Sequence, residues 1–431
     1  MNYKKFVVYV TLATLLLAAL AAAAQDEPFI TPVPCDEPGQ LTMWVWDENW
    51  ARVISSAIDV WVENYCPGAQ VNLQQQPWGQ YWDLLRTNVA GGSLPDVFNM
   101  SQTFFYDYAS NEVLLPLDEY LEAAGVDTSI WGSGMVDPYR FGEEQRLYAV
   151  PVNWDTVGIY YNKDMFDAAG VPYPTSDWTW DDFAAAAAAL TDPENDVYGA
   201  AVYAGFQTGY PNWIAATGVS PAVAPGRAAC TLTEPGSLEA LNFLADLQAQ
   251  GYMPSISIMG GAGADDAFNF WLAGRVAMIS GGSWKLPDAT AQATFNWDVV
   301  QFPRHPETGR TRSILHAVGY VAAANTPNPD LAANLIIFLG SDEAQAFFAQ
   351  AGGVAPANPG LQDEWLAGFA ETGINAQAFV NAIEDSQGVT IFGEIWDVVN
   401  NELPINIFDL GVSVEEATQM ACEFIETQLP Q

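Results

Sequence analysis

A tryptophan follows a candidate buried strand in the stretch MISGGSWKL (residues 278–286). The apolar residues at its start are typical of a strand, and the glycines indicate a bend of the backbone close to a ligand. Trp284 is one of 16 tryptophans, more than a core alone would need. A large flat ring in this place can stack on the face of a bound molecule. We therefore expect Trp284 to lie in a binding site.

Polar and aromatic residues also follow the first two candidate strands. Asp47 and Glu48 come directly after the apolar stretch LTMWVW (41–46), and Trp78 follows the second strand. Because ligands of open α/β sheets bind beyond the carboxyl ends of the strands, these residues are candidate ligand contacts. The alternative for both acidic residues is that they cap the helix that begins near Trp50.

Two further polar groups interrupt an extended apolar segment, residues 148–166. Asn153 and Asp155 stand where a buried strand would be apolar, and their side chains could form hydrogen bonds with a ligand. A hinge residue that caps backbone groups is the alternative for Asp155. His316 lies in a second extended segment, where a lone histidine is more often structural than ligand-binding.

Several kinds of catalytic or metal site lack support in the sequence. GGSWK (281–285) lacks the second glycine of the Gly-x-Ser-x-Gly motif, and DPENDVYG (192–199) lacks the sixth-position glycine of a calcium loop. Two histidines and no Cys-x-x-Cys give no indication of zinc, and no Walker motif is present. We expect a protein that is not an enzyme, with no metal or cofactor. The rival is a secreted glycoside hydrolase, for which Asp47 and Asp155 would be the carboxylate pair.

The order of elements predicts an α/β fold. Strand, helix, strand, helix and strand alternate from residue 41 to residue 100, which indicates an open, parallel sheet. A second α/β region begins near residue 179. The extended segments 148–166 and 316–324 predict two crossings between these regions, so the two lobes are expected to be interleaved in sequence and joined by a hinge.

Four stretches resemble the extracellular solute-binding proteins of ABC importers, in particular the family 1 sugar binders that include the maltodextrin binder. They occur in the family's order and span nearly the whole chain from about residue 40. The resemblance implies a two-lobed, type II periplasmic-binding-protein-like fold with several hinge crossings and a central ligand cleft. The stretches are GGSLPDVF (91–98), VGIYYNKDMFDAAGVPYP with WTWDDF (157–183), FNFWLAGRVAMISGGSW (268–284) and PDLAANLIIFLGSDEAQAFFAQAGGVAP (329–356).

The same resemblance implies roles for particular residues. Asp155 and the loop of Asp47 and Glu48 match polar ligand contacts, and Trp284 matches a sugar-stacking tryptophan. Gln102 lies near a further contact position, where this chain lacks the charged pair of the maltodextrin binder, and that departure puts maltodextrin itself in doubt. Core packing is the alternative for most of the remaining aromatic candidates, which are Tyr210, Trp213, Phe392 and Trp396.

The crossings and the resemblance together predict how the chain is divided. A signal peptide of residues 1–24 precedes a proline-rich leader of residues 25–39. The expected lobes are an N-terminal one of residues 40–152 and 320–360 and a C-terminal one, with the hinge, of residues 153–319 and 361–431.

The N-terminus predicts export. Lys4 and Lys5 precede a long apolar run that ends in an Ala-x-Ala pattern, which is typical of a secretory signal peptide cut after Ala24. A retained membrane anchor is the alternative. No cysteine stands at the end of the run, so we expect a periplasmic or extracellular protein that is not a lipoprotein.

Four cysteines in an exported protein fit two disulfides. Cys35 precedes the first strand and Cys66 follows the first helix. Because that helix runs back antiparallel to its strand, the two cysteines are brought together, which leaves Cys230 for Cys422. The other two connectivities remain open at this point.

The charge balance restricts the partners. A formal net charge of -39 opposes binding to nucleic acid and to anionic membranes. The resemblance implies a small-molecule carbohydrate as ligand, the membrane permease of an ABC importer as partner, and a monomer. Polyols, glycerol-phosphate esters and peptides are the alternative ligands within this class.

Overall fold

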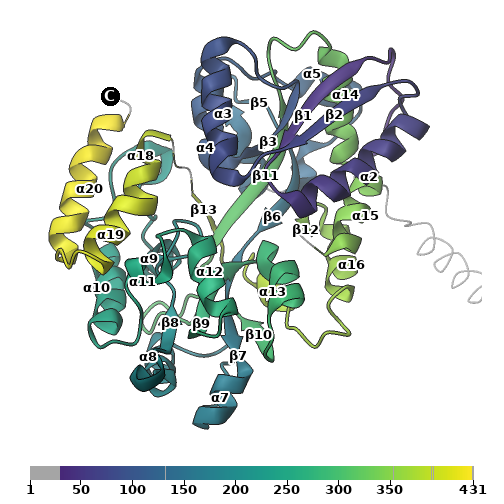
Figure 1. The fold of residues 1–431 in the computed structure, drawn as a ribbon. Helices are drawn as coiled ribbons and strands as arrows, with labels where there is room; N and C mark the ends of the chain where they lie inside the picture. Colours follow the sequence, from purple (N-terminus) through teal and green to yellow (C-terminus); the bar gives the residue numbers. More distant parts are fainter. Residues whose placement is uncertain (1–29, 132, 353, 390, 392, 430–431) are drawn as a thin grey trace, which may run out of the picture.

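The protein forms two α/β lobes with a cleft between them, as expected from the sequence (Figure 1). The computed structural model describes residues 30–131, 133–352, 354–389, 391 and 393–429. The predicted signal peptide lies outside these residues. Among the described helices, none combines the length and the apolar character needed to cross a membrane.

The larger sheet is the centre of the first lobe. Its strand order is β12-β6-β11-β3-β1-β2, and β13 pairs with β11. The first strand pairs in parallel with β2 and β3, which confirms the predicted β-α-β-α-β start. β11 runs antiparallel to both β3 and β6. The strands are β1 (Gln40–Val45), β2 (Gln70–Gln75), β3 (Val97–Ser101), β6 (Val150–Asp155), β11 (Ile314–Ala322), β12 (Ala355–Pro356) and β13 (Gln387–Gly388).

The smaller sheet is the centre of the second lobe, and its order is β10-β7-β9-β8. β7 and β9 are buried along their whole length, which explains why both are apolar runs without alternation. The strands are β7 (Val157–Asn162), β8 (Tyr198–Ala201), β9 (Val276–Gly282) and β10 (Trp297–Val300), and a separate two-stranded ribbon consists of β4 (Arg140–Phe141) and β5 (Arg146–Leu147).

The first crossing between the lobes is a single residue, Thr156, which separates β6 from β7. β6 and β11 stay paired from Val150 and Tyr320 to Asp155 and His316. This pairing keeps residues 153–155 and 314–319 in the larger sheet, a few residues beyond the boundaries expected from the sequence.

Helices flank both sheets (Figure 1). The main helices that accompany the larger sheet are α2 (Glu48–Asn64), α3 (Trp78–Gly91), α4 (Gln102–Ser110), α5 (Asp118–Ala123), α6 (Ser133–Val136), α14 (Pro329–Leu339), α15 (Asp342–Ala351) and α16 (Gln362–Ala367). Those of the second lobe are α7 (Lys163–Ala169), α8 (Trp180–Leu190), α9 (Tyr210–Thr217), α10 (Pro235–Ala249), α11 (Ile256–Met259), α12 (Ala264–Leu272), α13 (Leu286–Gln292), α17 (Gln377–Asn381), α18 (Gly393–Asp397), α19 (Leu403–Phe408) and α20 (Val414–Gln428).

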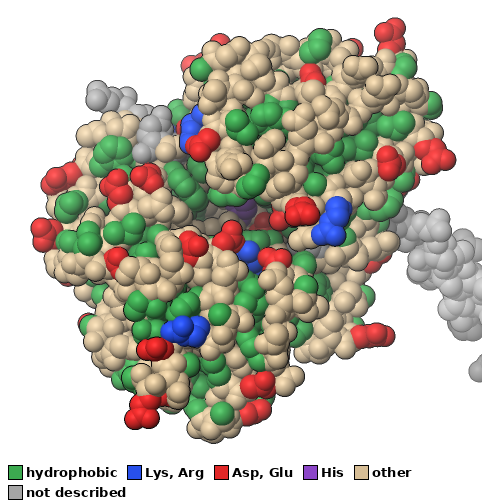
Figure 2. Space-filling view, viewed as in Figure 1, with side chains coloured by type: hydrophobic (Ala, Val, Ile, Leu, Met, Phe, Trp, Pro, Cys, Tyr) green, Lys and Arg blue, Asp and Glu red, His purple; other side chains and the backbone are tan. Residues whose placement is uncertain are grey.

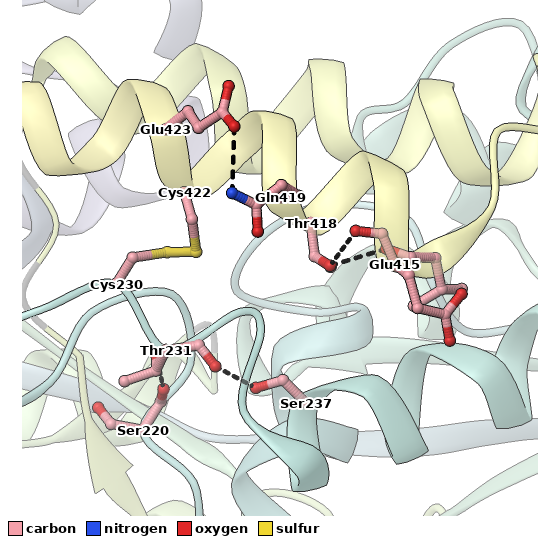
Figure 3. Close-up of a disulfide and its surroundings, with 10 residues drawn as sticks. Ser220, Cys230, Thr231, Ser237, Glu415, Thr418, Gln419, Cys422 and Glu423 are labelled. Carbon is pink, nitrogen blue, oxygen red and sulfur yellow. Dashed lines mark hydrogen bonds between the residues drawn. A yellow bond between two sulfur atoms is a disulfide. The ribbon is translucent and has the colours of Figure 1, made fainter.

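Both expected disulfides are present. Cys35 bonds to Cys66 beside the start of the larger sheet, and Cys230 bonds to Cys422 in α20 (Figure 3). The second bond attaches the last helix of the chain to the body of the second lobe.

Candidate ligand-binding cleft

A cleft of about 780 Å³ lies between the two lobes and takes residues from both. In the space-filling view a hollow between the lobes has acidic and basic side chains at its rim and a histidine in its depth (Figure 2). A cleft of this size is ample for a small organic ligand. Several of its residues follow β1, β2, β8 and β9, and two lie at the end of β6, as the position of ligand sites in α/β sheets predicts.

A buried polar network forms the floor of the cleft. Asp155 is 5% exposed, and its Oδ1 accepts a hydrogen bond from Ser283 Oγ at 3.0 Å. Its Oδ2 lies 3.7 Å from His316 Nδ1, opposite it in the β6–β11 pairing. His316 Nε2 in turn lies 2.7 Å from Ser101 Oγ. Asp155 therefore connects the loop of Trp284 in the second lobe with the ends of two strands of the first lobe.

Within the described part of the chain, two amide groups at the cleft have atoms without a hydrogen-bond partner. Asn153 is 2% exposed, and its Oδ1 is buried with no hydrogen bond. Gln207 Nε2 is also buried and unpaired. An unsatisfied buried amide is costly, and both residues line the cleft. The cleft residues thus hold one unsatisfied acceptor and one unsatisfied donor.

Trp284 lies across the backbone of Gly282. A Cβ atom at Gly282 would fall 1.8 Å from Cζ3 of the Trp284 ring, so the ring occupies the space that a side chain would fill. This contact explains the glycine pair in MISGGSWKL. Among the described residues, no other aromatic ring stacks on Trp284, which leaves a face of the half-buried ring to the cleft.

The next residue fixes this loop to α12 and α13. Lys285 Nζ lies 2.7 Å from Asp265 Oδ1 and 3.3 Å from Asp288 Oδ2. Burial lowers the pKa of Lys285, but the two carboxylates outweigh it and raise the pKa above its ordinary value. Lys285 is therefore a charged anchor that holds Trp284 in place.

An aromatic wall lines the cleft from the first lobe to the second. The ring of Trp78 packs edge-on against Trp46 at 5.0 Å. Trp396 joins the lobes, because its ring lies 5.0 Å from Phe104 of the first lobe and 6.2 Å from Phe206 of the second. Trp46, Trp78, Phe206 and Trp396 all line the cleft, so apolar ring faces are available on both sides.

Asp47 has two roles that the sequence presented as alternatives. It is the N-cap of α2, where its Oδ1 accepts a hydrogen bond from Trp50 N at 2.8 Å, and it also lines the cleft. Although water in the cleft reaches Asp47, the surrounding walls partly desolvate it, and this burial raises its pKa above 3.8. The hydrogen bond from Trp50 lowers the pKa, whereas the charge of Asp288 across the cleft raises it further.

The raised pKa of Asp47 predicts a pH-dependent stability difference. Because the folded protein holds this proton above the unfolded value of 3.8, the free energy of unfolding falls as pH rises through that window. Asp47→Asn keeps a capping oxygen but cannot ionise. We expect the variant to gain stability relative to the wild type as pH rises from about 3 to about 7. Denaturant melts at several pH values test this, and parallel curves for the two proteins would contradict it.

The contact between Trp284 and Gly282 predicts the effect of a single methyl group. Gly282→Ala would place its Cβ inside the tryptophan ring, so the ring must move and ligand affinity should fall about tenfold, or about 1.4 kcal/mol. Titration calorimetry measures this loss. Gly91→Ala, whose Cβ would meet only Ser93 Oγ at 3.4 Å, is the matched control and should leave the affinity unchanged. The double variant with Trp284→Ala should lose no more than Trp284→Ala alone.

Many of the residues expected in the site lie together at the cleft. The structure brings together Asp47, Trp78, Asn153, Asp155, Trp284, His316 and Trp396. The other four described candidates, Glu48, Gln102, Tyr210 and Trp213, do not line the cleft. Phe392 lies outside the described residues.

Tyr210 and Trp213 belong to the core of the second lobe, not to the cleft. Tyr210 is 0% exposed and donates its hydroxyl to Val399 O at 2.8 Å. Trp213 packs against Trp180 and Phe183. The reason is that every residue from Tyr210 to Ala216 of α9 is buried, so no face of this helix is free to present an aromatic ring to a ligand.

Gln102 and Glu48 also lie outside the cleft lining. The Gln102 amide is occupied by β11, because Nε2 donates to Leu315 O at 2.8 Å and Oε1 accepts from Ala317 N at 3.1 Å. It borders a smaller cavity beside the cleft, next to His316 and Trp396. Glu48 is exposed in the first turn of α2.

The sequence reasoning missed several lining residues. Phe206 and Gln207 precede α9 in the stretch GFQTGY (205–210), and the helix start at Tyr210 is the signal that could have separated these loop residues from the buried helix. The other missed residues include Trp46, Arg52, Asp265, Asp266 and Lys285. Across the described part of the chain, no three His, Cys, Asp or Glu side chains converge as a metal site would require.

Known proteins share both the sequence pattern and the fold. Residues 63–375 match the family model described as bacterial extracellular solute-binding protein. The chain is 22% identical over 348 residues to the galactooligosaccharide-binding protein of Bacillus subtilis, which covers 79% of this chain and 77% of that protein.

Two solved structures illustrate the likeness in fold. An ABC substrate-binding protein of Listeria monocytogenes in complex with cycloalternan has a TM-score of 0.81 and 24% identity, over 91% of this chain and 99% of that one. A protein of Mycobacterium tuberculosis in complex with glycerophosphocholine has a TM-score of 0.78 and 20% identity, over 90% and 98%. The fold is therefore common to proteins with different bound ligands.

Proposed function

We propose that the cleft of this protein binds a carbohydrate for delivery to the membrane permease of an ABC importer. The chain belongs to the bacterial extracellular solute-binding protein family. It is therefore an exported receptor and not an enzyme. We further propose that it works as a monomer without a lipid anchor. The similarity to a galactooligosaccharide-binding protein and to a cycloalternan-bound receptor supports a sugar or oligosaccharide as the ligand.

The observation that carries this proposal is the combination of groups in the cleft. Sugar rings present apolar C–H faces and rows of hydroxyl groups. The cleft offers ring faces at Trp78, Trp284 and Trp396, and free hydrogen-bonding atoms at Asn153 and Gln207. Aromatic planes with a few polar groups are what a carbohydrate site requires.

Contacts from both lobes provide a reason for the lobes to close. Trp78 belongs to the first lobe and Trp284 to the second, so a ligand between them would stabilise the arrangement in which both are in reach. A ligand can shift the hinge only through such differential affinity. The Asp155–Ser283 hydrogen bond lies beside the single-residue crossing at Thr156 and would stay close to the axis of this movement.

Thermal unfolding in the presence of candidate solutes tests the proposal. A ligand at a hundredfold excess over its dissociation constant should add about 2.7 kcal/mol to the free energy of unfolding. We expect this stabilisation with at least one mono- or oligosaccharide, and no consumption of the sugar. A response only to glycerophosphocholine, a polyol or a peptide would replace the carbohydrate with that solute class, and turnover of a glycan would refute the receptor function.

A further inference from the structure

One carboxylate at the cleft has no hydrogen-bond or ion-pair partner among the described residues. Asp266 lies in the first turn of α12, is half-buried and lines the cleft. Among the described residues, no side chain or backbone group forms a hydrogen bond or an ion pair with it, whereas its neighbour Asp265 is bound by Lys285. A partly desolvated carboxylate is stabilised by a donor, and best by a charged one.

Most of the charges that line the cleft are negative. Four carboxylates and two cations line it, and among the described residues only Lys285 of these cations is paired with carboxylates. Lys285 lies within 3.3 Å of two carboxylates, whereas Arg52 is exposed to solvent on α2, donates to the neutral Asn49 Oδ1 and keeps its charge, so the carboxylates still outnumber the cations. The net charge of -39 adds a negative electrostatic potential, which also attracts cations. The lining carboxylates are Asp47, Asp155, Asp265 and Asp266.

Two further features of the cleft also attract positively charged donors. The faces of tryptophan rings bind cations through the ring quadrupole, and Trp78, Trp284 and Trp396 line the same space as Asp266. The buried Oδ1 of Asn153, which is 2% exposed and unpaired, is an acceptor that requires an N–H or O–H group. Neither feature would stabilise a carboxylate or phosphate on the ligand.

From these observations we infer that the cleft selects a carbohydrate that carries a protonated amine, and that Asp266 binds this amine. The inference rests on the proposed function and narrows its ligand class. Amine-bearing sugars should bind more tightly than neutral sugars of the same skeleton, and uronic acids or sugar phosphates more weakly than either.

Calorimetry with a matched pair of probes tests the inference. The tetramer of β-1,4-linked glucosamine and cellotetraose share one backbone and differ by an amine in place of a hydroxyl group on each ring. Maltotetraose, galactotetraose and a galacturonate tetramer complete the panel, at a pH of about 5.5 and low salt, where the amines and the carboxylates are charged.

We expect the glucosamine tetramer to bind at least about tenfold more tightly than any neutral or acidic member. Asp266→Asn should remove this preference and retain the affinity for neutral sugars. Asp59→Asn, the same change of charge on the exposed face of α2, should leave the preference intact.

Each other outcome overturns a defined part of the argument. Tightest binding by a neutral or acidic sugar would refute the amine preference and leave the proposed function in place. A preference that survives Asp266→Asn, or an equal loss for all sugars, would refute the role of Asp266. Binding of a non-carbohydrate solute alone would remove the proposed function and this inference together.

Discussion

Trp284→Ala should weaken carbohydrate binding by about 2 kcal/mol, or roughly thirtyfold, without unfolding the protein. The ring lies over Gly282 and its free face borders the cleft, so its removal takes away the apolar surface on which a sugar ring can stack. The fold should tolerate the change, because Trp284 is only half-buried and follows the end of β9. Titration calorimetry and a denaturant melt measure the two quantities.

Two further variants separate stacking from other effects. Trp284→Phe keeps an aromatic face of smaller area and should lose less affinity than the alanine variant. Tyr173→Ala removes an exposed aromatic ring outside the cleft and should not change the affinity. If Trp284→Ala bound the sugar as tightly as the wild type, Trp284 would not be part of the site.

The sequence predicted the first lobe and the position of the cleft because both follow from local patterns. The alternation of apolar strands and amphipathic helices from residue 40 to residue 101 is a property of neighbouring residues. Residues at the ends of strands, such as Asp47 and Asp155, line the cleft because strand ends converge at one edge of a sheet.

The errors arose where tertiary packing decides the environment. Tyr210 and Trp213 look like ligand contacts in sequence, but α9 is covered on every side, and coverage depends on helices distant in sequence. Asp266 was missed because its place at the cleft also depends on tertiary packing. An acidic pair at a helix start is typical of a solvated N-terminus, and only the packing of α12 beside the cleft reveals that one carboxylate of the pair is free.

The disulfide pairing is a case in which a geometric argument sufficed. The first bond closes a single strand-helix unit, with a sequence separation of 31, whereas the second spans 192 residues. Between Cys230 and Cys422 the chain passes through the first lobe, which includes β11, α14 and α15, and returns to the second lobe with α17, α18 and α19 before it reaches α20. The second bond therefore joins two parts of one lobe that are interrupted by the other.

This arrangement predicts that loss of the Cys230–Cys422 bond is the more destabilising of the two. Loop-closure entropy gives about 5.3 kcal/mol for the longer loop and about 3.7 kcal/mol for the shorter one, so the double variant Cys230→Ser/Cys422→Ser should lose about 1.6 kcal/mol more than Cys35→Ser/Cys66→Ser. Both cysteines of the longer loop are buried. Thr231, beside Cys230, forms hydrogen bonds with Ser237 and with Ser220 (Figure 3). Denaturant melts of the two variants measure the difference.

Hydrogen exchange and ligand titration show which part of the molecule the Cys230–Cys422 disulfide stabilises. Since no cysteine lines the cleft, the affinity for the ligand should be unchanged in both double variants under native conditions. Amide protection should fall first in α20 when the longer bond is absent, because that helix then depends on packing alone. An equal loss of stability in both variants, with α20 still protected, would mean that non-covalent contacts already hold the last helix to its lobe and that loop length is not what the second disulfide contributes.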